Sequence, residues 1–154
     1  MYLVATVLFM GVLPVLSILI ERHLAGSPDL IVLAGRWFVF WAVGVRLFLA
    51  GLQQTRDPGY TATTIFAIKD KAAESLVAEI GFGNLAIGTL GMASIFDRGW
   101  VTPAAIVGCA FYGLAGFKHL FNRKRNRIGQ VAMVSDLAMF ALLAVYLPIA
   151  LLIE

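Results

Sequence analysis

The chain has 154 residues, of which 60% are hydrophobic and 14% are charged, and its mean hydropathy is +0.88. Soluble domains carry about 45–50% apolar and about 25% charged residues, so this composition excludes a water-soluble globular domain. The formal charge of +3 comes mainly from one short basic cluster, which indicates membrane topology rather than nucleic-acid binding. We predict a single integral membrane domain over residues 1–154 that contacts the lipid bilayer and no nucleic acid.

Five apolar blocks are long enough to cross a bilayer, which takes about 17–25 residues. They lie at residues 2–20, 30–51, 75–96, 101–121 and 131–153. Continuous apolar blocks predict helices, because the strands of a membrane β-barrel alternate apolar and polar residues. The sequence therefore predicts an all-α, polytopic transmembrane helical bundle with a four-helix core and an additional N-terminal helix.

The positive charges of the loops predict the orientation of these helices. Cationic loops stay in the cytoplasm, and most Lys and Arg residues lie between the second and third blocks and between the fourth and fifth. The N-terminus is then inside and the C-terminus outside, in the cytoplasmic (inner) membrane. The first block has no basic residues before it and no small-residue cleavage site after it, so we expect a retained helix rather than a signal peptide.

A charged segment joins the second and third blocks. Apolar residues recur there at helical spacing around Lys69, Asp70, Lys71 and Glu74. This pattern is typical of an amphipathic helix that lies in the membrane interface. We predict such a helix over residues 60–74.

Small residues predict how the helices pack, because they let two backbones approach closely in lipid. The third and fourth blocks each place small residues along one helical stripe: Gly81, Asn84, Gly88 and Gly91 in the third, and Gly113 and Gly116 in the fourth. We expect the third helix to be central. We also expect the glycine-rich faces to support a homo-oligomer or contact within a larger membrane complex.

Ionisable side chains at membrane depth cost about 2.5–3.5 kcal/mol each on insertion, so each needs a partner or a function. Four of them come from four different blocks and fall in the predicted cytoplasmic half: Arg46, Glu79, His119 and Asp136. We predict that they converge with Asn84 on one ligand- or proton-binding cluster. Arg46 is the expected counter-ion, Glu79 and Asp136 the binding carboxylates, His119 the titrating gate and Asn84 a neutral ligand.

Structural alternatives stay open for each member of this cluster. Arg46 and His119 lie near enough to the interface to reach the lipid headgroups, and Glu79 faces outward if the amphipathic helix extends into the third block. Asp136 is too short to reach the interface, which leaves a structural ion pair or a functional carboxylate. A metal held by His119, Glu79 and Asp136 is chemically allowed.

Two further residues lie apart from the cluster. Arg36 is flanked by Trp37 and is expected in an aromatic belt with a cation–π contact. Cys109 is the only cysteine, which excludes an intrachain disulfide. No catalytic motif is present, so the sequence predicts no catalytic residues and leaves any cofactor unknown.

The segments AEIGFGNLAIGTLG and AFYGLAGFKHLF and the stretch that follows them resemble an uncharacterised family of small bacterial and archaeal multi-pass membrane proteins, a domain of unknown function. The resemblance covers the third to fifth blocks, although the turn ESLVA lacks the Ser-Pro-Phe-Gln of that family. It implies that the family's polar positions are Glu79, Asn84, Gly88, His119, Asn126 and Asp136. More loosely, Arg36, Gly44 and the helix count resemble the DoxX-like group, which implies quinone- or thiol-linked redox chemistry.

Three functions agree with these features. The preferred one is binding of a small solute, ion or proton in the polar cluster, with transport across the bilayer as its extension. The alternative is a non-catalytic accessory or assembly subunit of a larger membrane complex, which suits the small size and the aromatic surface of the second helix. The third is a DoxX-like quinone-linked redox protein.

Overall fold

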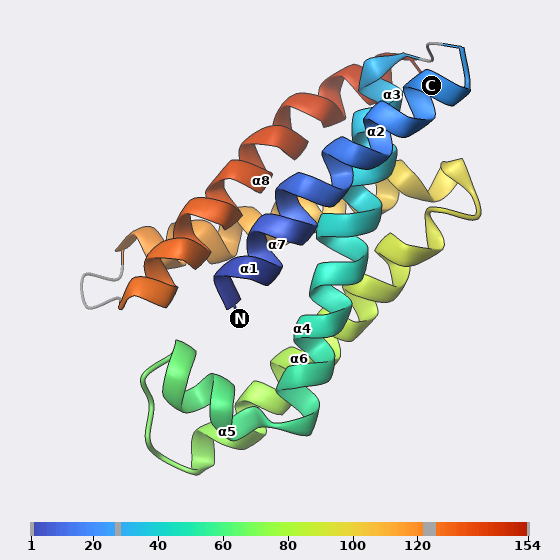
Figure 1. Ribbon diagram of the computed structural model, residues 1–154. Coiled ribbons are helices and arrows are strands. Elements are labelled where there is room, and N and C mark those ends of the chain that lie inside the picture. The colour runs from blue at the N-terminus through green and yellow to red at the C-terminus, as the bar shows by residue number, and fades with distance from the viewer. Residues whose placement is uncertain (1, 27–28, 122–125, 154) are drawn as a thin grey trace.

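The computed structural model describes residues 2–26, 29–121 and 126–153, and within them it contains helices and short connections but no strand (Figure 1). In this part of the chain, five helices are long and apolar enough to cross a membrane. We name them spans 1 to 5: Tyr2–Leu24, Leu30–Arg56, Ala72–Ala93, Arg98–Phe121 and Arg127–Leu152. The predicted all-α bundle and its number of spans are confirmed, and the orientation stays a prediction.

The spans, and the segment between spans 2 and 3, divide into shorter elements where the type of helix changes. Elements η1, η2 and η3 are π-helical, and η4 is a 3₁₀-helix. In chain order the elements are α1 (Tyr2–Val7), η1 (Leu8–Val12), α2 (Leu13–Leu24), α3 (Leu30–Phe38), η2 (Val39–Val45), α4 (Arg46–Arg56), α5 (Pro58–Tyr60), η3 (Thr61–Ile65), α6 (Ala72–Ala93), η4 (Arg98–Trp100), α7 (Val101–Phe121) and α8 (Arg127–Ile153).

The bundle has two ends, which we name by the predicted orientation. The predicted outer end holds the end of α2, the start of α3, the end of α6 and the last turns of α8 (Figure 1). The predicted cytoplasmic end holds the start of α1, the short helix α5, the end of α7 and the start of α8. Side chains at the two ends therefore belong to separate sites.

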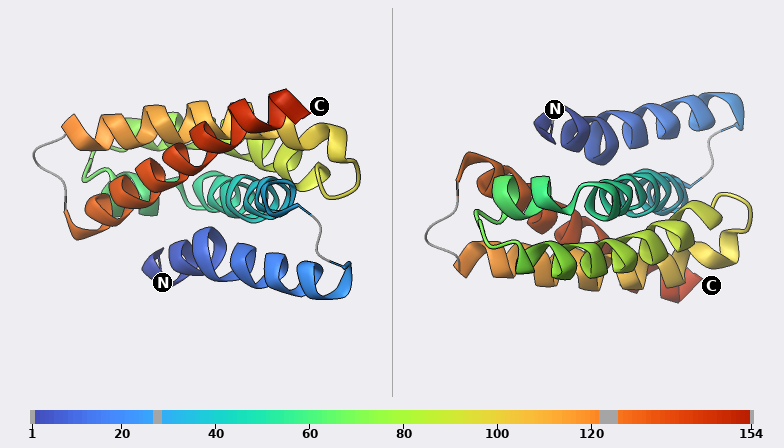
Figure 2. Two further views of the ribbon diagram at one scale, coloured as in Figure 1. Left: turned by 90° about the horizontal axis from the view of Figure 1, so that it is seen from above. Right: turned by 90° about the horizontal axis from the view of Figure 1, so that it is seen from below.

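Span 2 lies at the centre of the bundle. Span 1 packs on one side of it, and spans 3, 4 and 5 lie on the other (Figure 2). Its π-helical part supplies the fully buried Val39, Ala42 and Val43, whereas one face of α6 is exposed. The prediction that span 3 is central is therefore wrong, because the small residues of α6 occupy only one of its faces.

Glycines set the close approach of spans 2 and 3. A methyl group on Gly44 would lie 2.7 Å from the carbonyl carbon of Gly91, and one on Gly51 would lie 2.7 Å from the carbonyl oxygen of Gly81. Gly88 also packs on the backbone of span 2. Larger side chains at these positions would force the two helices apart.

Span 4 uses its glycines in the same way against span 5. Gly113 packs on the ring of Phe140, and Gly116 packs on Leu137. The glycine stripes of spans 3 and 4 are thus covered inside the chain. A homo-oligomer, which stays a proposal, would need another surface.

The segment between spans 2 and 3 contains less helix than predicted. The helical turns of α5 and η3 end at Ile65, and α6 begins at Ala72. Between them, Ala67 has a φ of 57°, a backbone conformation that is uncommon outside glycine. The predicted amphipathic helix over residues 60–74 is therefore interrupted, and its location in the membrane interface stays a prediction.

Candidate functional site

An ion pair between spans 2 and 5 lies inside the bundle. Nη2 of Arg46, the first residue of α4, is 3.5 Å from Oδ1 of Asp136 in α8, and the two side chains are only 13% and 7% exposed. Buried charges of opposite sign reduce each other's cost in a medium of low dielectric constant. The structure therefore contains one of the two pairings that the sequence predicts for Arg46.

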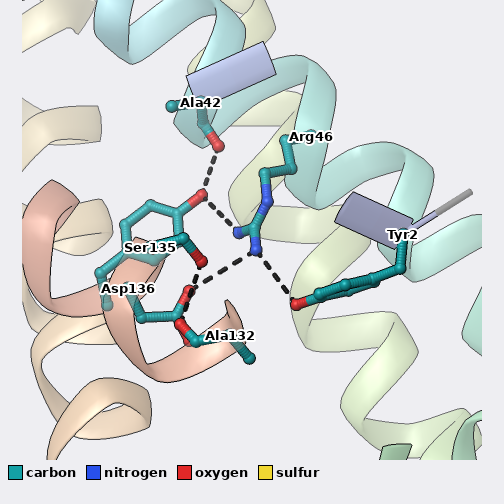
Figure 3. A network of polar contacts seen from close by, with 7 residues as sticks. Tyr2, Ala42, Arg46, Ala132, Ser135 and Asp136 are labelled. Atoms are coloured by element: carbon teal, nitrogen blue, oxygen red, sulfur yellow. Dashed lines mark hydrogen bonds and ion pairs between the residues drawn. The ribbon is translucent and has the colours of Figure 1, made fainter. Parts of the chain in front are cut away.

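Two tyrosine hydroxyls complete the contacts of the Arg46 guanidinium (Figure 3). Nη1 donates to the hydroxyl of Tyr112 at 3.2 Å, and Nη2 donates to that of Tyr2 at 3.5 Å. The guanidinium carbon also lies 5.5 Å from the centre of the Tyr112 ring, which is within the range of a cation–π contact. Arg46, Asp136, Tyr112 and Tyr2 together form what we call the Arg46 network, which joins spans 1, 2, 4 and 5.

The π-helical stretch η2 leaves the backbone carbonyl of Ala42 free to accept a hydrogen bond from this network. In an α-helix the backbone N–H of Arg46 would donate to the carbonyl of Ala42, four residues earlier. Here it donates to the carbonyl of Trp41, five residues earlier, and the carbonyl of Ala42 accepts the hydroxyl of Tyr112 instead. Because a tyrosine hydroxyl has one proton, the Tyr112 oxygen then presents lone pairs to Arg46.

Asp136 keeps unused capacity to accept a hydrogen bond. Its Oδ1 is buried and has no hydrogen-bond partner among the residues described. The 3.5 Å to Arg46 Nη2 exceeds the about 2.7–2.9 Å of a charge-assisted hydrogen bond. The neighbouring Ser135 hydroxyl donates to the carbonyl of Ala132 in its own helix. A buried carboxylate with an open acceptor can take up a proton or a cation.

Glu79 does not join the Arg46 network. It lies on the exposed face of α6, because residues two apart on an α-helix differ by about 200° around its axis and Gly81 faces span 2. The predicted convergence of Glu79 with Arg46, His119 and Asp136 is wrong in this respect. In the described part of the chain no three His, Cys, Asp or Glu side chains come close enough to hold a metal ion.

Asn84 lies in the interface of spans 2 and 3 rather than beside Arg46. It is buried, and its Nδ2 donates to Oε1 of Gln54 at 2.7 Å. Gln54 is eight residues after Arg46, about 12 Å along the helix. Asn84 therefore forms a separate polar contact, in which its own Oδ1 has no partner among the described residues.

His119 and Asn126 lie nearer the predicted cytoplasmic end. His119 is half-buried and lies seven residues, about 10 Å, along α7 from Tyr112. Asn126 accepts a hydrogen bond from the backbone of Gly129 and donates one to the carbonyl of Thr64, so it caps α8 and fastens it to η3. The basic cluster at residues 123–125 lies outside the described residues.

A second arginine–carboxylate pair joins spans 1 and 2 near the predicted outer end. Oε1 of Glu21 accepts from Arg36 Nη1 at 2.5 Å, and Oε2 accepts from Trp37 Nε1 at 2.6 Å. The guanidinium carbon of Arg36 lies 5.3 Å from the centre of the Trp37 ring, which confirms the predicted cation–π contact. Trp41 donates to the hydroxyl of Ser17 at 3.0 Å. Both oxygens of Glu21 are thus occupied.

Sequence reasoning missed several partners in these networks. Tyr112 carries a readable signal, because it lies four residues from both Gly108 and Gly116 and so shares their buried face. Gln54 lies one turn after Gly51 and shares its face in the same way. Tyr2 is the first residue of the first apolar block, and no glycine spacing around it predicts that it faces the bundle.

Comparison with known proteins gives one match. The model of a family of unknown function (DUF6790) matches residues 1–153. No curated protein and no solved structure matches the chain. The match agrees with the resemblance to an uncharacterised domain of unknown function and gives no support to the looser DoxX-like one.

Proposed function

The chain belongs to the DUF6790 family, a family of unknown function, and we propose from its buried charges that it binds a proton at Asp136 and carries it across the bilayer. Arg46 serves as the counter-ion, and Tyr2 and Tyr112 hold the guanidinium. The proton takes precedence over a larger solute because the open acceptor on Asp136 is a single buried oxygen, which can take up a proton without a cavity beside it.

The open acceptor on Asp136 is the observation that carries this proposal. A purely structural pair would be expected to use both carboxylate oxygens as hydrogen-bond acceptors, as Glu21 does with Arg36 and Trp37. Asp136 instead meets Arg46 through one oxygen at 3.5 Å, and that oxygen has no hydrogen bond within the described residues. This geometry supports a carboxylate that exchanges a proton without rebuilding its surroundings.

The tyrosines support the second state, in which Asp136 is neutral. A buried arginine that loses its counter-ion normally costs about 3–5 kcal/mol. Tyr112 and Tyr2 both offer oxygen lone pairs to the Arg46 guanidinium, and the Tyr112 ring adds a cation–π contact. These contacts persist when Asp136 is protonated and lower the cost of the uncompensated charge.

Proton flux into liposomes that contain the purified protein and a pH-sensitive dye tests the proposal. Asp136→Asn keeps the shape of the side chain and a hydrogen-bond acceptor for Arg46, and we expect it to reduce the flux to the leak of empty liposomes. Glu79→Gln removes a carboxylate from the exposed face of the bundle and is the matched control, with flux expected to equal wild type. Equal flux in Asp136→Asn and wild type would remove the transport claim.

A second candidate function, an accessory subunit of a larger membrane complex, is favoured by the outer face of α6. Glu79 is an exposed carboxylate within span 3, and a methyl group on Gly83, one turn further, would meet nothing within 4 Å. A charged side chain beside a glycine on the lipid-facing side fits contact with another helix. Cysteine crosslinking from Gly83→Cys in native membranes would identify such a neighbour, and crosslinking to lipid alone would contradict this candidate.

The third function, quinone-linked redox chemistry, rests on the DoxX-like resemblance alone. The family match gives that resemblance no support. Solvent extraction of the purified protein would reveal a bound quinone, and its absence from the extract would remove this candidate.

A further inference from the structure

A cleft of about 150 Å³ opens at the predicted outer end, where α3, α7 and α8 meet. Its walls are mostly apolar and include Val32, Val101 and Ala150, and two arginines also line it, Arg36 of α3 and Arg98 of η4. It is separate from the Arg46 network, which none of its lining residues joins. An apolar cleft with two guanidinium groups suits a ligand that has both an apolar part and a negative charge.

Arg36 has a donor to spare at this cleft. Its Nη1 is bound to Glu21, but its Nε is buried and has no hydrogen-bond acceptor among the residues described. Buried N–H groups in folded proteins nearly always have a partner. An orphaned Nε on a side chain that lines a cleft points to an acceptor supplied from outside the chain.

Arg98 adds a second positive charge, which has no ion pair among the described residues. It is exposed, and within the described residues no carboxylate forms an ion pair with it. The adjacent Asp97 uses its Oδ1 to cap η4 through the backbone N–H of Gly99. Glu21 is occupied by Arg36 and Trp37, so among the described residues that line the cleft, Arg98 is the charged one without an ion pair.

The depths of the two arginines match the shape of a membrane lipid. Arg98 lies at the beginning of span 4, at the level of the headgroups, whereas Arg36 lies six residues after Leu30, about 9 Å further along the helix. Guanidinium groups bind phosphate through paired hydrogen bonds, and basic pockets between membrane helices bind anionic headgroups. We propose that this cleft binds an anionic phospholipid, with the phosphate at Arg98, an ester oxygen of the lipid at the free Nε of Arg36 and an acyl chain along the apolar wall.

Lipid binding to the delipidated, detergent-solubilised protein, measured by native mass spectrometry, tests this site. The probes are dioleoyl phosphatidylglycerol and the zwitterionic dioleoyl phosphatidylcholine. We expect wild type to prefer phosphatidylglycerol by about fivefold, from about one headgroup-level charge contact, and Arg98→Gln to lose that preference. Arg22→Gln, an exposed arginine at the same end that does not line the cleft, is the matched control and should bind as wild type.

Two further measurements test the apolar wall of the cleft and identify the source of the ligand. Val32→Trp fills the apolar wall without changing the charge, and it should also abolish the preference. Inorganic phosphate at millimolar concentration should not displace the lipid, because it has no chain to cover the apolar wall. Equal binding of the two lipids, equal behaviour of Arg98→Gln and Arg22→Gln, wild-type binding by Val32→Trp, or displacement by inorganic phosphate would each overturn the proposal.

Discussion

The molecule holds two arginine–carboxylate pairs of opposite character. At the predicted outer end, Glu21 and Arg36 are 2.5 Å apart, and both oxygens of Glu21 accept hydrogen bonds. In the Arg46 network, Asp136 lies 3.5 Å from its arginine and has an oxygen without a hydrogen bond in the described residues. In the first pair both carboxylate oxygens accept a hydrogen bond, whereas in the second pair one carboxylate oxygen is free to accept one.

The two pairs also differ in how deeply their side chains are buried. The side chains of Arg36 and Glu21 are 23% and 18% exposed, and those of Arg46 and Asp136 are 13% and 7% exposed. The more deeply buried carboxylate is therefore the less satisfied one, although an unsatisfied buried acceptor costs about 1–3 kcal/mol. The contacts of Glu21 suit a structural link between spans 1 and 2, and the open oxygen of Asp136 suits the proposed proton site.

The largest expected effect comes from removing the arginine of each pair. Arg46→Ala leaves Asp136 buried without a counter-ion and should destabilise the protein by about 3–5 kcal/mol. Arg36→Ala leaves Glu21 with the Trp37 hydrogen bond and partial exposure, so we expect about 1–3 kcal/mol. Unfolding in mixed micelles measures both. A loss in Arg46→Ala no greater than that in Arg36→Ala would contradict the distinction between the two pairs.

The next effect concerns the acceptor that the π-helix provides. Tyr112→Phe leaves the Ala42 carbonyl without its donor and deprives Arg46 of an acceptor, and we expect a loss of about 1–3 kcal/mol. The same unfolding measurement applies. Phe111→Leu, at a neighbouring residue that is only partly buried, is the control for general repacking. A stability of Tyr112→Phe equal to wild type would show that the hydroxyl bridge contributes nothing.

A smaller effect is expected in the Glu21 pair. Trp37→Phe keeps an aromatic ring beside Arg36 but removes the N–H that donates to Glu21 Oε2. Arg36 still satisfies the other oxygen, so the loss should be about 1 kcal/mol. Thermal unfolding of the variant beside Trp100→Phe, an exposed tryptophan, measures it. A loss in Trp37→Phe equal to that in the control would argue against the structural link between spans 1 and 2.

The smallest effect is expected at Glu79, which belongs to neither pair. Glu79→Gln should change stability by less than about 0.5 kcal/mol, as is usual for an exposed substitution away from special contacts. A larger loss in the detergent-solubilised protein would mean that Glu79 has a partner inside the chain.

The sequence predicts those features that the cost of membrane burial dictates. Apolar blocks must form helices that satisfy their own backbones, so the five spans are readable from hydropathy. A buried Asp136 must find a cation from another span, and Arg46 is the one that the structure provides. The glycine stripe of α6 also marks a packed face, although it does not reveal that span 2, rather than span 3, is central.

Other features depend on geometry that hydropathy does not encode. The exposure of Glu79 follows from helix geometry rather than hydropathy. With 3.6 residues per turn, Glu79 lies about 200° around the helix axis from Gly81, so the spacing of the two residues predicts it. The π-helical η2 shifts the backbone hydrogen-bond register by one residue, and no residue pattern in VFWAVGV predicts this shift. The acceptor at Ala42 and the part played by Tyr112 follow from that register, so they needed the three-dimensional structure.

Infrared difference spectroscopy of the reconstituted protein tests the central claim most directly. Lowering the pH should produce the C=O band of a buried protonated carboxyl, separate from the bands of exposed carboxyls, in wild type and in Glu21→Gln, and this band should be missing in Asp136→Asn. Such a result would assign the exchangeable proton to the open carboxylate. A band that remains in Asp136→Asn and disappears in Glu21→Gln would contradict the account.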